Sequence, residues 1–92
     1  MIFFIVQNDQ SPSLFNVYPN PTTGKLTLEL PGLEESQIAV IQIFGMMGSL
    51  VVNEELTGSA KKEISLESHP NGVYLICVMA GDRREMKKVV KL

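Results

Sequence analysis

The sequence has few of the side chains that carry chemistry or cross-link a fold. Its 92 residues include one cysteine, one histidine and no tryptophan. A single cysteine cannot form an intrachain disulfide, so the framework of many small secreted domains is excluded. Cys77 lies within an apolar run, which indicates a small partly buried hydrophobe rather than a reactive thiol. No Cys-x-x-Cys, His-x-His or calcium-loop spacing occurs, so the sequence predicts no metal site.

The usual residues of catalysis are missing as well. A nucleophile needs a base beside it, and the one histidine, His69, precedes a proline in a segment that predicts a turn. The glutamate doublets at 34–35 and 54–55 would point to opposite faces of a strand, so neither forms an acid–base pair. The glycines are isolated and build no phosphate loop. We therefore expect no catalytic residue, no cofactor and no small-molecule substrate.

The chain has no excess of positive charge. Eight Lys and Arg stand against ten Asp and Glu, a formal net charge of -2. Nucleic-acid binders show a basic excess on one face, so no nucleic-acid partner is predicted. The basic residues nevertheless gather near the C-terminus, where a simple interpretation is a solvated edge strand protected by charge. They are Arg83, Arg84, Lys87, Lys88 and Lys91.

Long hydrophobic runs are also missing. The apolar run at 1–6 is far shorter than the about 20 residues of a transmembrane helix, so no transmembrane segment is predicted. No Lys or Arg precedes this run and polar residues follow it, so it is not interpreted as a signal peptide. Residues 7–14 are polar and contain a proline, which indicates a linker. We therefore expect a short apolar segment and linker over 1–14 and one folded domain over 15–92.

Short apolar stretches at regular spacing fill the domain. Hydrophobic residues make up 45% and charged residues 20% of the chain, a balance typical of folded domains. The stretches alternate with period two and are bounded by Gly, Pro, Asn or charge pairs, which predicts strands. The nearly all-apolar run 72–79 predicts a central strand covered on both faces. The predicted strands are 15–18, 25–30, 37–44, 50–56, 62–66, 72–79 and 85–92. Seven short strands favour an all-β antiparallel sandwich over a barrel.

The most distinctive turn is Pro19-Asn20-Pro21-Thr22-Thr23-Gly24. Pro19 removes a ladder donor, Asn20 can begin an Asx turn, and Gly24 can take a backbone conformation that other residues avoid. A four-residue loop built on a type I turn is the expected result. By itself, this pattern predicts only a hairpin.

Four motifs in register extend the pattern along the chain. The first motif is Val17-Tyr18-Pro19-Asn20-Pro21, and the second is Ile41-Gln42-Ile43-Phe44 together with Gly48-Ser49-Leu50-Val51. The third is Asn71-Gly72-Val73-Tyr74-Leu75-Ile76, and the fourth is Lys87-Lys88-Val89-Val90-Lys91. This series resembles the C-terminal sorting domain of proteins exported by the type IX (Por) secretion system of Bacteroidota, over about residues 15–92.

The resemblance implies an immunoglobulin-like β-sandwich at the C-terminus of secreted cargo. It implies a noncatalytic sorting signal, recognised in the periplasm by the type IX outer-membrane translocon, which passes the cargo to the cell surface or the medium. In many members a sortase-like peptidase then removes the domain. These two proteins are the partners that the resemblance implies.

The family's motif positions carry over to individual residues of this chain. Gly45 departs from the family, which usually has Asp or Asn there, and Cys77 stands where a polar or basic residue is common. The second departure makes one strand face more apolar. The implied sorting-motif residues are Pro19, Asn20, Pro21, Gly24, Gly48, Gly72, Tyr74, Lys87, Lys88 and Lys91.

Two further expectations follow. A sorting domain needs cargo and an export signal, and only 14 residues precede this domain. We therefore expect the chain to be a fragment, a truncated reading frame or an engineered piece of a larger protein, with 1–6 left over or recruited as an extra strand. The alternative function is a β-sandwich module that binds carbohydrate or protein, because this fold by itself does not select between the two roles. Carbohydrate binding would need exposed aromatic side chains, and the chain has two Tyr and four Phe.

Overall fold

The computed structural model describes residues 13–58 and 60–92, and seven strands form within them. The strands are β1 Asn16–Tyr18, β2 Lys25–Glu29, β3 Ile38–Phe44, β4 Leu50–Thr57, β5 Lys61–Ser65, β6 Gly72–Ala80 and β7 Arg83–Lys91. Each predicted strand is present, with bounds that differ by at most two residues at either end. Within the described residues no helix is long and apolar enough to cross a bilayer.

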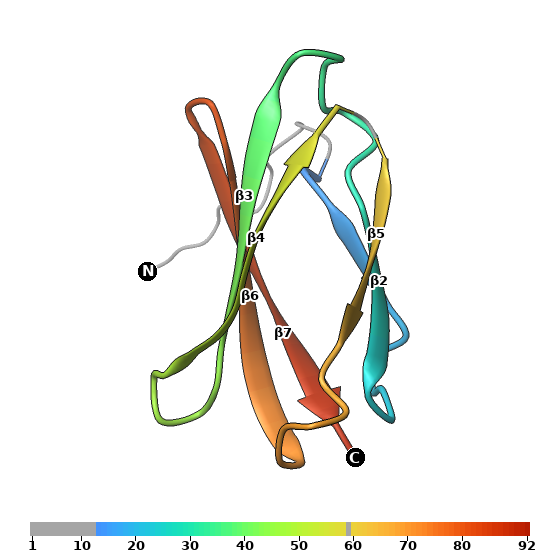
Figure 1. Cartoon of the computed structure of the whole chain (residues 1–92), viewed down its shortest axis with the longest axis vertical. Helices are drawn as coiled ribbons and strands as arrows, with labels where there is room; N and C mark the ends of the chain where they lie inside the picture. Colours follow the sequence, from blue (N-terminus) through green and yellow to red (C-terminus); the bar gives the residue numbers. More distant parts are fainter. Residues whose placement is uncertain (1–12, 59) are drawn as a thin grey trace, which may run out of the picture.

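The strands form two antiparallel sheets packed face to face (Figure 1). One sheet has the order β1-β2-β5 and the other has the order β4-β3-β6-β7. The chain crosses between the sheets after β2, after β4 and again after β5, which is the Greek-key connection of immunoglobulin-like sandwiches. The all-β sandwich predicted from the sequence is therefore confirmed.

Period-two alternation explains how the core forms. Residues of β2 and β3 alternate between buried and partly exposed positions, so one face of each strand supplies the core. Phe15 precedes β1 and is completely buried. The core residues are Leu14, Phe15, Leu26, Leu28, Leu30, Leu33, Ala39, Ile41, Ile43, Ile64, Leu66, Tyr74, Ile76, Val78, Ala80 and Val89.

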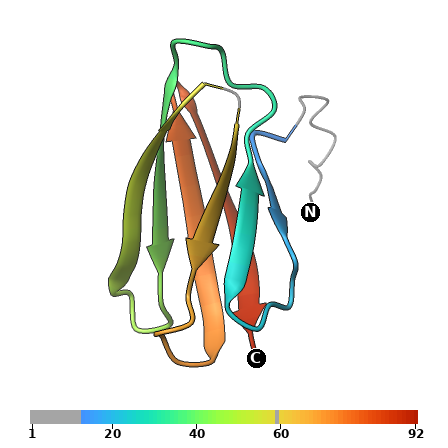
Figure 2. The same ribbon diagram turned by 45° about the vertical axis from the view of Figure 1, so that its right-hand side comes forward.

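The central strand β6 differs from its prediction on one face. It lies between β3 and β7, and Tyr74, Ile76 and Val78 point into the core. No other described strand lies over its opposite face (Figures 1 and 2), where the side chain of Val73 is exposed. The prediction of a strand covered on both faces is thus wrong for the described part of the chain. The apolar run therefore includes a face that none of the described strands covers.

The Pro-Asn-Pro segment also departs from the predicted four-residue loop. The connection between β1 and β2 spans residues 19–24, and the peptide bonds before Pro19 and Pro21 are both cis. Within this connection, Thr22 pairs in parallel with Lys91 of the other sheet. The segment closes the predicted hairpin of β1 and β2 with a longer loop, and it also bridges the two sheets, because its polar groups pair with β7.

Candidate functional site

Most of the implied sorting-motif residues lie at one end of the sandwich. This end, here called the motif end, comprises the connections 19–24, 45–49 and 66–71 and the C-terminal residues 91–92. In Figures 1 and 2 these segments are at the bottom of the molecule, beside the C-terminus. The structure therefore brings together segments that are far apart in the sequence.

Backbone hydrogen bonds attach the 19–24 connection to the end of β7. The Thr22 amide donates to the Val90 carbonyl at 2.8 Å, and the Leu92 amide donates to the Thr22 carbonyl at 2.9 Å. Both bonds join segments about 70 positions apart in the chain. Together they hold the C-terminal residues against the opposite sheet.

The Asn20 side chain continues this pairing. Its Nδ2 donates to the Lys88 carbonyl at 3.1 Å, and its Oδ1 accepts from the Val90 amide at 3.0 Å. The carboxamide thus pairs with β7 as a neighbouring peptide group would. Asn20 and Thr22 with the backbone of residues 88–92 are called the clasp below.

Thr22 is a functional candidate that the sequence prediction missed. It is only 2% exposed, and its Oγ1 donates to the Lys25 carbonyl at 2.6 Å while accepting from the Gly24 amide at 3.0 Å. The hydroxyl therefore holds the turn in the shape that presents the Thr22 backbone to β7. A signal was available, because a threonine two residues before a glycine is typical of hydroxyl-stabilised turns.

Gly24 secures the same turn to the 66–71 connection. Its φ is 148°, and a Cβ built there would lie 2.6 Å from Cγ of Glu67. Its carbonyl accepts from the Leu66 amide at 2.7 Å. Positive φ and close approach both require glycine at this position.

The three lysines of the basic ending have different surroundings. Lys91 is 8% exposed, and its Nζ donates to Oδ1 of Asn71 at 2.9 Å. Lys87 points away from the motif end. Its Nζ donates to the Phe15 carbonyl at 2.6 Å and lies 4.9 Å from the Phe15 ring centroid. The Lys88 side chain is exposed. The interpretation of a solvated basic edge therefore holds for Lys88 and is wrong for Lys91, whose ammonium group is bound within the motif end.

Glu85 anchors the start of the domain to β7. Its Oε1 accepts from Oγ of Ser13 at 2.8 Å and from the amides of Leu14 and Phe15 at 3.0 and 3.3 Å. Burial of the carboxylate raises its pKa, but these hydrogen bonds and the charge of Lys87 outweigh burial, so the pKa of Glu85 is lowered from its ordinary 4.5.

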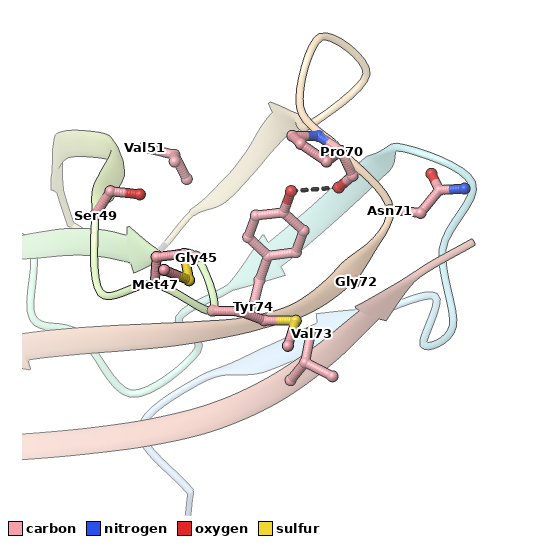
Figure 3. A pocket seen from close by; sticks show the side chains of 10 residues that line it. Gly45, Met47, Ser49, Val51, Pro70, Asn71, Gly72, Val73 and Tyr74 are labelled. Atoms are coloured by element: carbon pink, nitrogen blue, oxygen red, sulfur yellow. Dashed lines mark hydrogen bonds between the residues drawn. The ribbon is translucent and has the colours of Figure 1, made fainter.

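An apolar hollow of about 210 Å³ opens between the 45–49 and 66–71 connections (Figure 3). The Tyr74 ring points into it, and the Tyr74 hydroxyl donates to the Pro70 carbonyl. A tyrosine at the start of this strand, bonded to backbone a few residues upstream, is the tyrosine corner of immunoglobulin-like sandwiches. The hollow is lined by Gly45, Met46, Met47, Ser49, Val51, Pro70, Asn71, Gly72, Val73 and Tyr74.

Both remaining motif glycines border this hollow or its turn. Gly72 has a φ of 150°, and a Cβ there would lie 3.3 Å from Sδ of Met46. Gly48 has a φ of 84° in the turn that the Gly45 amide closes by donating to the Ser49 carbonyl at 2.9 Å. Gly45, which departs from the family pattern, therefore still closes its turn through backbone groups.

The motif end offers shape and backbone pairing, with little reactive chemistry. The described residues contain no group of three or more His, Cys, Asp or Glu able to hold a metal ion. The hollow is smaller than the roughly 300–1,000 Å³ of ordinary small-molecule sites, and apolar side chains form most of its wall. The arrangement is suited to holding the C-terminal strand in one conformation.

Fold and site together define a small β-sandwich module that secures its own C-terminal strand. Residues 16–92 match the family described as the secretion system C-terminal sorting domain, and the chain belongs to that family. The chain is also similar to the ulvan lyase NLR42 of Nonlabens ulvanivorans, with 29% identity over 77 residues. This match covers 84% of the chain and 14% of the lyase, so the chain spans a small part of that relative's length.

Family membership establishes the role of the domain. It is a C-terminal sorting domain that directs attached cargo across the outer membrane by type IX secretion. The type IX secretion system recognises it, and its cargo goes to the cell surface or the extracellular space.

Proposed function

We propose that the domain acts as a folded, noncatalytic address whose motif end is the part that the outer-membrane translocon recognises. The observation that carries this proposal is the clasp. Four hydrogen bonds from Asn20 and Thr22 hold residues 88–92 in one conformation. A preorganised segment loses less conformational entropy on binding than a flexible tail, so the clasp favours recognition.

The implied sorting-motif residues have three roles in this proposal. Asn20, with Thr22, pairs with β7, while the Lys91 side chain is held by Asn71. Gly24 and Gly48 provide positive-φ positions in connections of the motif end, and Gly72 provides one at the start of β6, next to the 66–71 connection. Pro19 and Pro21 flank Asn20, and Lys88 presents an exposed charge. Lys87 acts elsewhere, on Phe15.

The functional unit in this proposal is the domain over 15–92, with Ser13 and Leu14 attached to it. The bonds from Ser13, Leu14 and Phe15 to Glu85 support this boundary, because they secure the start of the domain to its last strand. Translocon recognition takes place in the periplasm, and the sortase-like peptidase acts on the domain after translocation.

The test is a fusion of residues 13–92 behind a signal peptide and a folded reporter in a host with a type IX system. We expect the reporter at the cell surface or in the medium, and in the periplasm when the host lacks the translocon. A fusion with Asn20→Ala and Thr22→Val should be exported less. The matched control is Asn16→Ala with Thr27→Val, two positions on the three-stranded sheet whose side chains point away from the core. Periplasmic retention of the unmodified folded fusion would contradict the proposal.

A further inference from the structure

The four-stranded sheet carries an apolar surface on the side away from the core. Its core side is supplied by alternate residues such as Ile41 and Ile76, so the residues between them point outward. This outer face consists of Ile38, Val40, Gln42, Phe44, Leu50, Asn53, Glu55, Thr57, Val73, Leu75, Cys77, Met79, Arg84, Met86, Lys88 and Val90.

The outer face is more apolar than the solvent-facing side of an antiparallel sheet usually is. Antiparallel sheets with one wet face normally alternate apolar and polar residues. In β6 the outward positions from Val73 to Met79 are all apolar. Large apolar side chains are exposed on it, with Met86 at 54%, Leu50 at 46% and Val73 at 39%. A contiguous exposed patch of this kind marks an interaction site.

Strand register makes the patch continuous from one sheet edge to the other. Leu50 pairs with Phe44, and Phe44 pairs with Leu75, so three apolar residues lie side by side. In the next row Cys77 lies between Gln42 and Met86. Cys77, which departs from the family pattern, thus lies at the centre of the outer face. It is only 7% exposed, so the exposed apolar area comes from its larger neighbours.

The charged residues at the rim of the outer face are basic at one sheet edge and acidic at the other. Arg84 and Lys88 are exposed along β7, on either side of Met86. Glu55 is exposed on β4, at the opposite edge. A complementary surface would be apolar at its centre and acidic where it meets β7, because opposite charges favour one orientation.

The patch is also continuous with the motif end. Val73, which pairs with Val90, lines the apolar hollow. The clasp bonds the backbone of Lys88 and Val90, whose side chains belong to the outer face. The clasp therefore positions one border of the patch.

We infer that the outer face is the docking surface for the type IX machinery, and that its partner is an apolar protein surface with acidic side chains over β7. This inference rests on the proposed function and deepens it, because it extends recognition from the motif end to the face of one sheet. Apolar contact supplies affinity, and Arg84 and Lys88 set the orientation.

The first experiment uses the reporter fusion with Leu50→Thr, Val73→Thr and Met86→Thr combined. Threonine keeps strand propensity and removes apolar surface, so the domain should stay folded. Export should fall on the order of tenfold. The control is Thr27→Ser with Glu63→Gln on the other sheet, which should export normally. Protease resistance of the periplasmic fraction shows that each variant is folded.

The second experiment tests the charges. Arg84→Glu and Lys88→Glu, made singly, should each reduce export several-fold, whereas Lys25→Glu on the other sheet should not. Equal effects of all three substitutions would show a general dependence on charge and would overturn the predicted orientation.

The remaining outcomes separate the two proposals. If the unmodified fusion is not exported, the proposed function fails before the outer face is tested. If it is exported and the folded triple variant is exported equally well, the docking surface is wrong. A second copy is the competing occupant. A dimer in sedimentation that Met86→Thr abolishes, with export unaffected, would assign the outer face to self-association and overturn the inference.

Discussion

At the scale of single residues, Asn20 shows why a side chain can take the place of a strand. Its carboxamide has a donor and an acceptor in the geometry of a peptide group, and both pair with β7. An aspartate has the same shape but only acceptors when ionised, so it would face the Lys88 carbonyl without a proton to donate. The position therefore requires an amide.

We expect Asn20→Ala to lower the free energy of unfolding by about 1–2 kcal/mol, because two hydrogen bonds to β7 are lost. The Val90 amide should also lose its protection from hydrogen exchange, since Oδ1 of Asn20 is its acceptor. Urea denaturation and exchange measured by NMR test both effects. Asn53→Ala, at an exposed position of β4, is the matched control. Unchanged protection of Val90 would contradict the clasp.

Gly24→Ala should destabilise the domain by about 1–3 kcal/mol, because the new Cβ meets Glu67 at a φ that other residues rarely adopt. Gly32→Ala should be near neutral or slightly stabilising, since nothing lies within 4 Å of its built Cβ. Thermal unfolding of the two variants measures the difference. Equal melting temperatures would show that neither φ nor contact at Gly24 matters.

The lowered pKa of Glu85 predicts that the stability of the domain falls at acid pH. Its pKa is lower in the folded than in the unfolded chain, so its stabilising effect is present above the ordinary value of 4.5 and is lost as pH falls through the lower folded value. Glu85→Gln should therefore reduce the stability difference between neutral and acid pH. Denaturation at several pH values from neutral downward tests this. An unchanged pH dependence in the variant would remove Glu85 as a contributor.

At the scale of elements, β7 is an edge strand with unusual protection. Edge strands expose unpaired backbone groups that can pair with other chains. Here Asn20 and Thr22, which belong to the β1–β2 connection of the other sheet, pair with residues 88–92. Lys91 closes the same end by bonding to Asn71. The C-terminal part of β7 is therefore closed by tertiary contacts rather than by exposed charge.

Shortening β7 should loosen the clasp in steps. Removing Leu92 deletes one hydrogen bond to Thr22 and should cost about 1 kcal/mol. Removing Lys91 as well also deletes the bond to Asn71 and the parallel bridge to Thr22, so the loss should be larger. Chemical denaturation of the two truncated chains gives the difference. Equal stability of both would show that Lys91 contributes nothing.

At the scale of the whole molecule, the strand that we propose for recognition also carries much of the stability. Every residue from Gly72 to Ala80 pairs with β7, and Val89 is completely buried. Removal of 85–92 should therefore unfold the domain. The NMR spectrum should lose its dispersed amide signals, and export should be lost while an attached reporter remains folded. A domain that stays folded without these residues would contradict the packing described for β7. Point substitutions in the clasp are the sharper test of recognition.

The strands and their inward residues were predictable from the sequence. Period-two alternation is a local property, so Leu26, Leu28, Ala39 and Ile41 could be assigned to the core before the partner sheet was known. The family's motifs likewise indicated which family the chain belongs to. The motifs could not predict what each residue does.

The sequence by itself determined an all-β domain with core-facing alternation, and its motifs indicated the sorting family. The tertiary structure decided the rest. Thr22 and Asn20 bind β7 about 70 residues away, and Lys91 is buried while Lys88 is exposed. Within residues 13–58 and 60–92, no strand covers the outer apolar face of β6. Alternation depends only on neighbours along a strand, whereas these features depend on which strands meet across the sandwich, and a turn's own residues do not specify its distant partner.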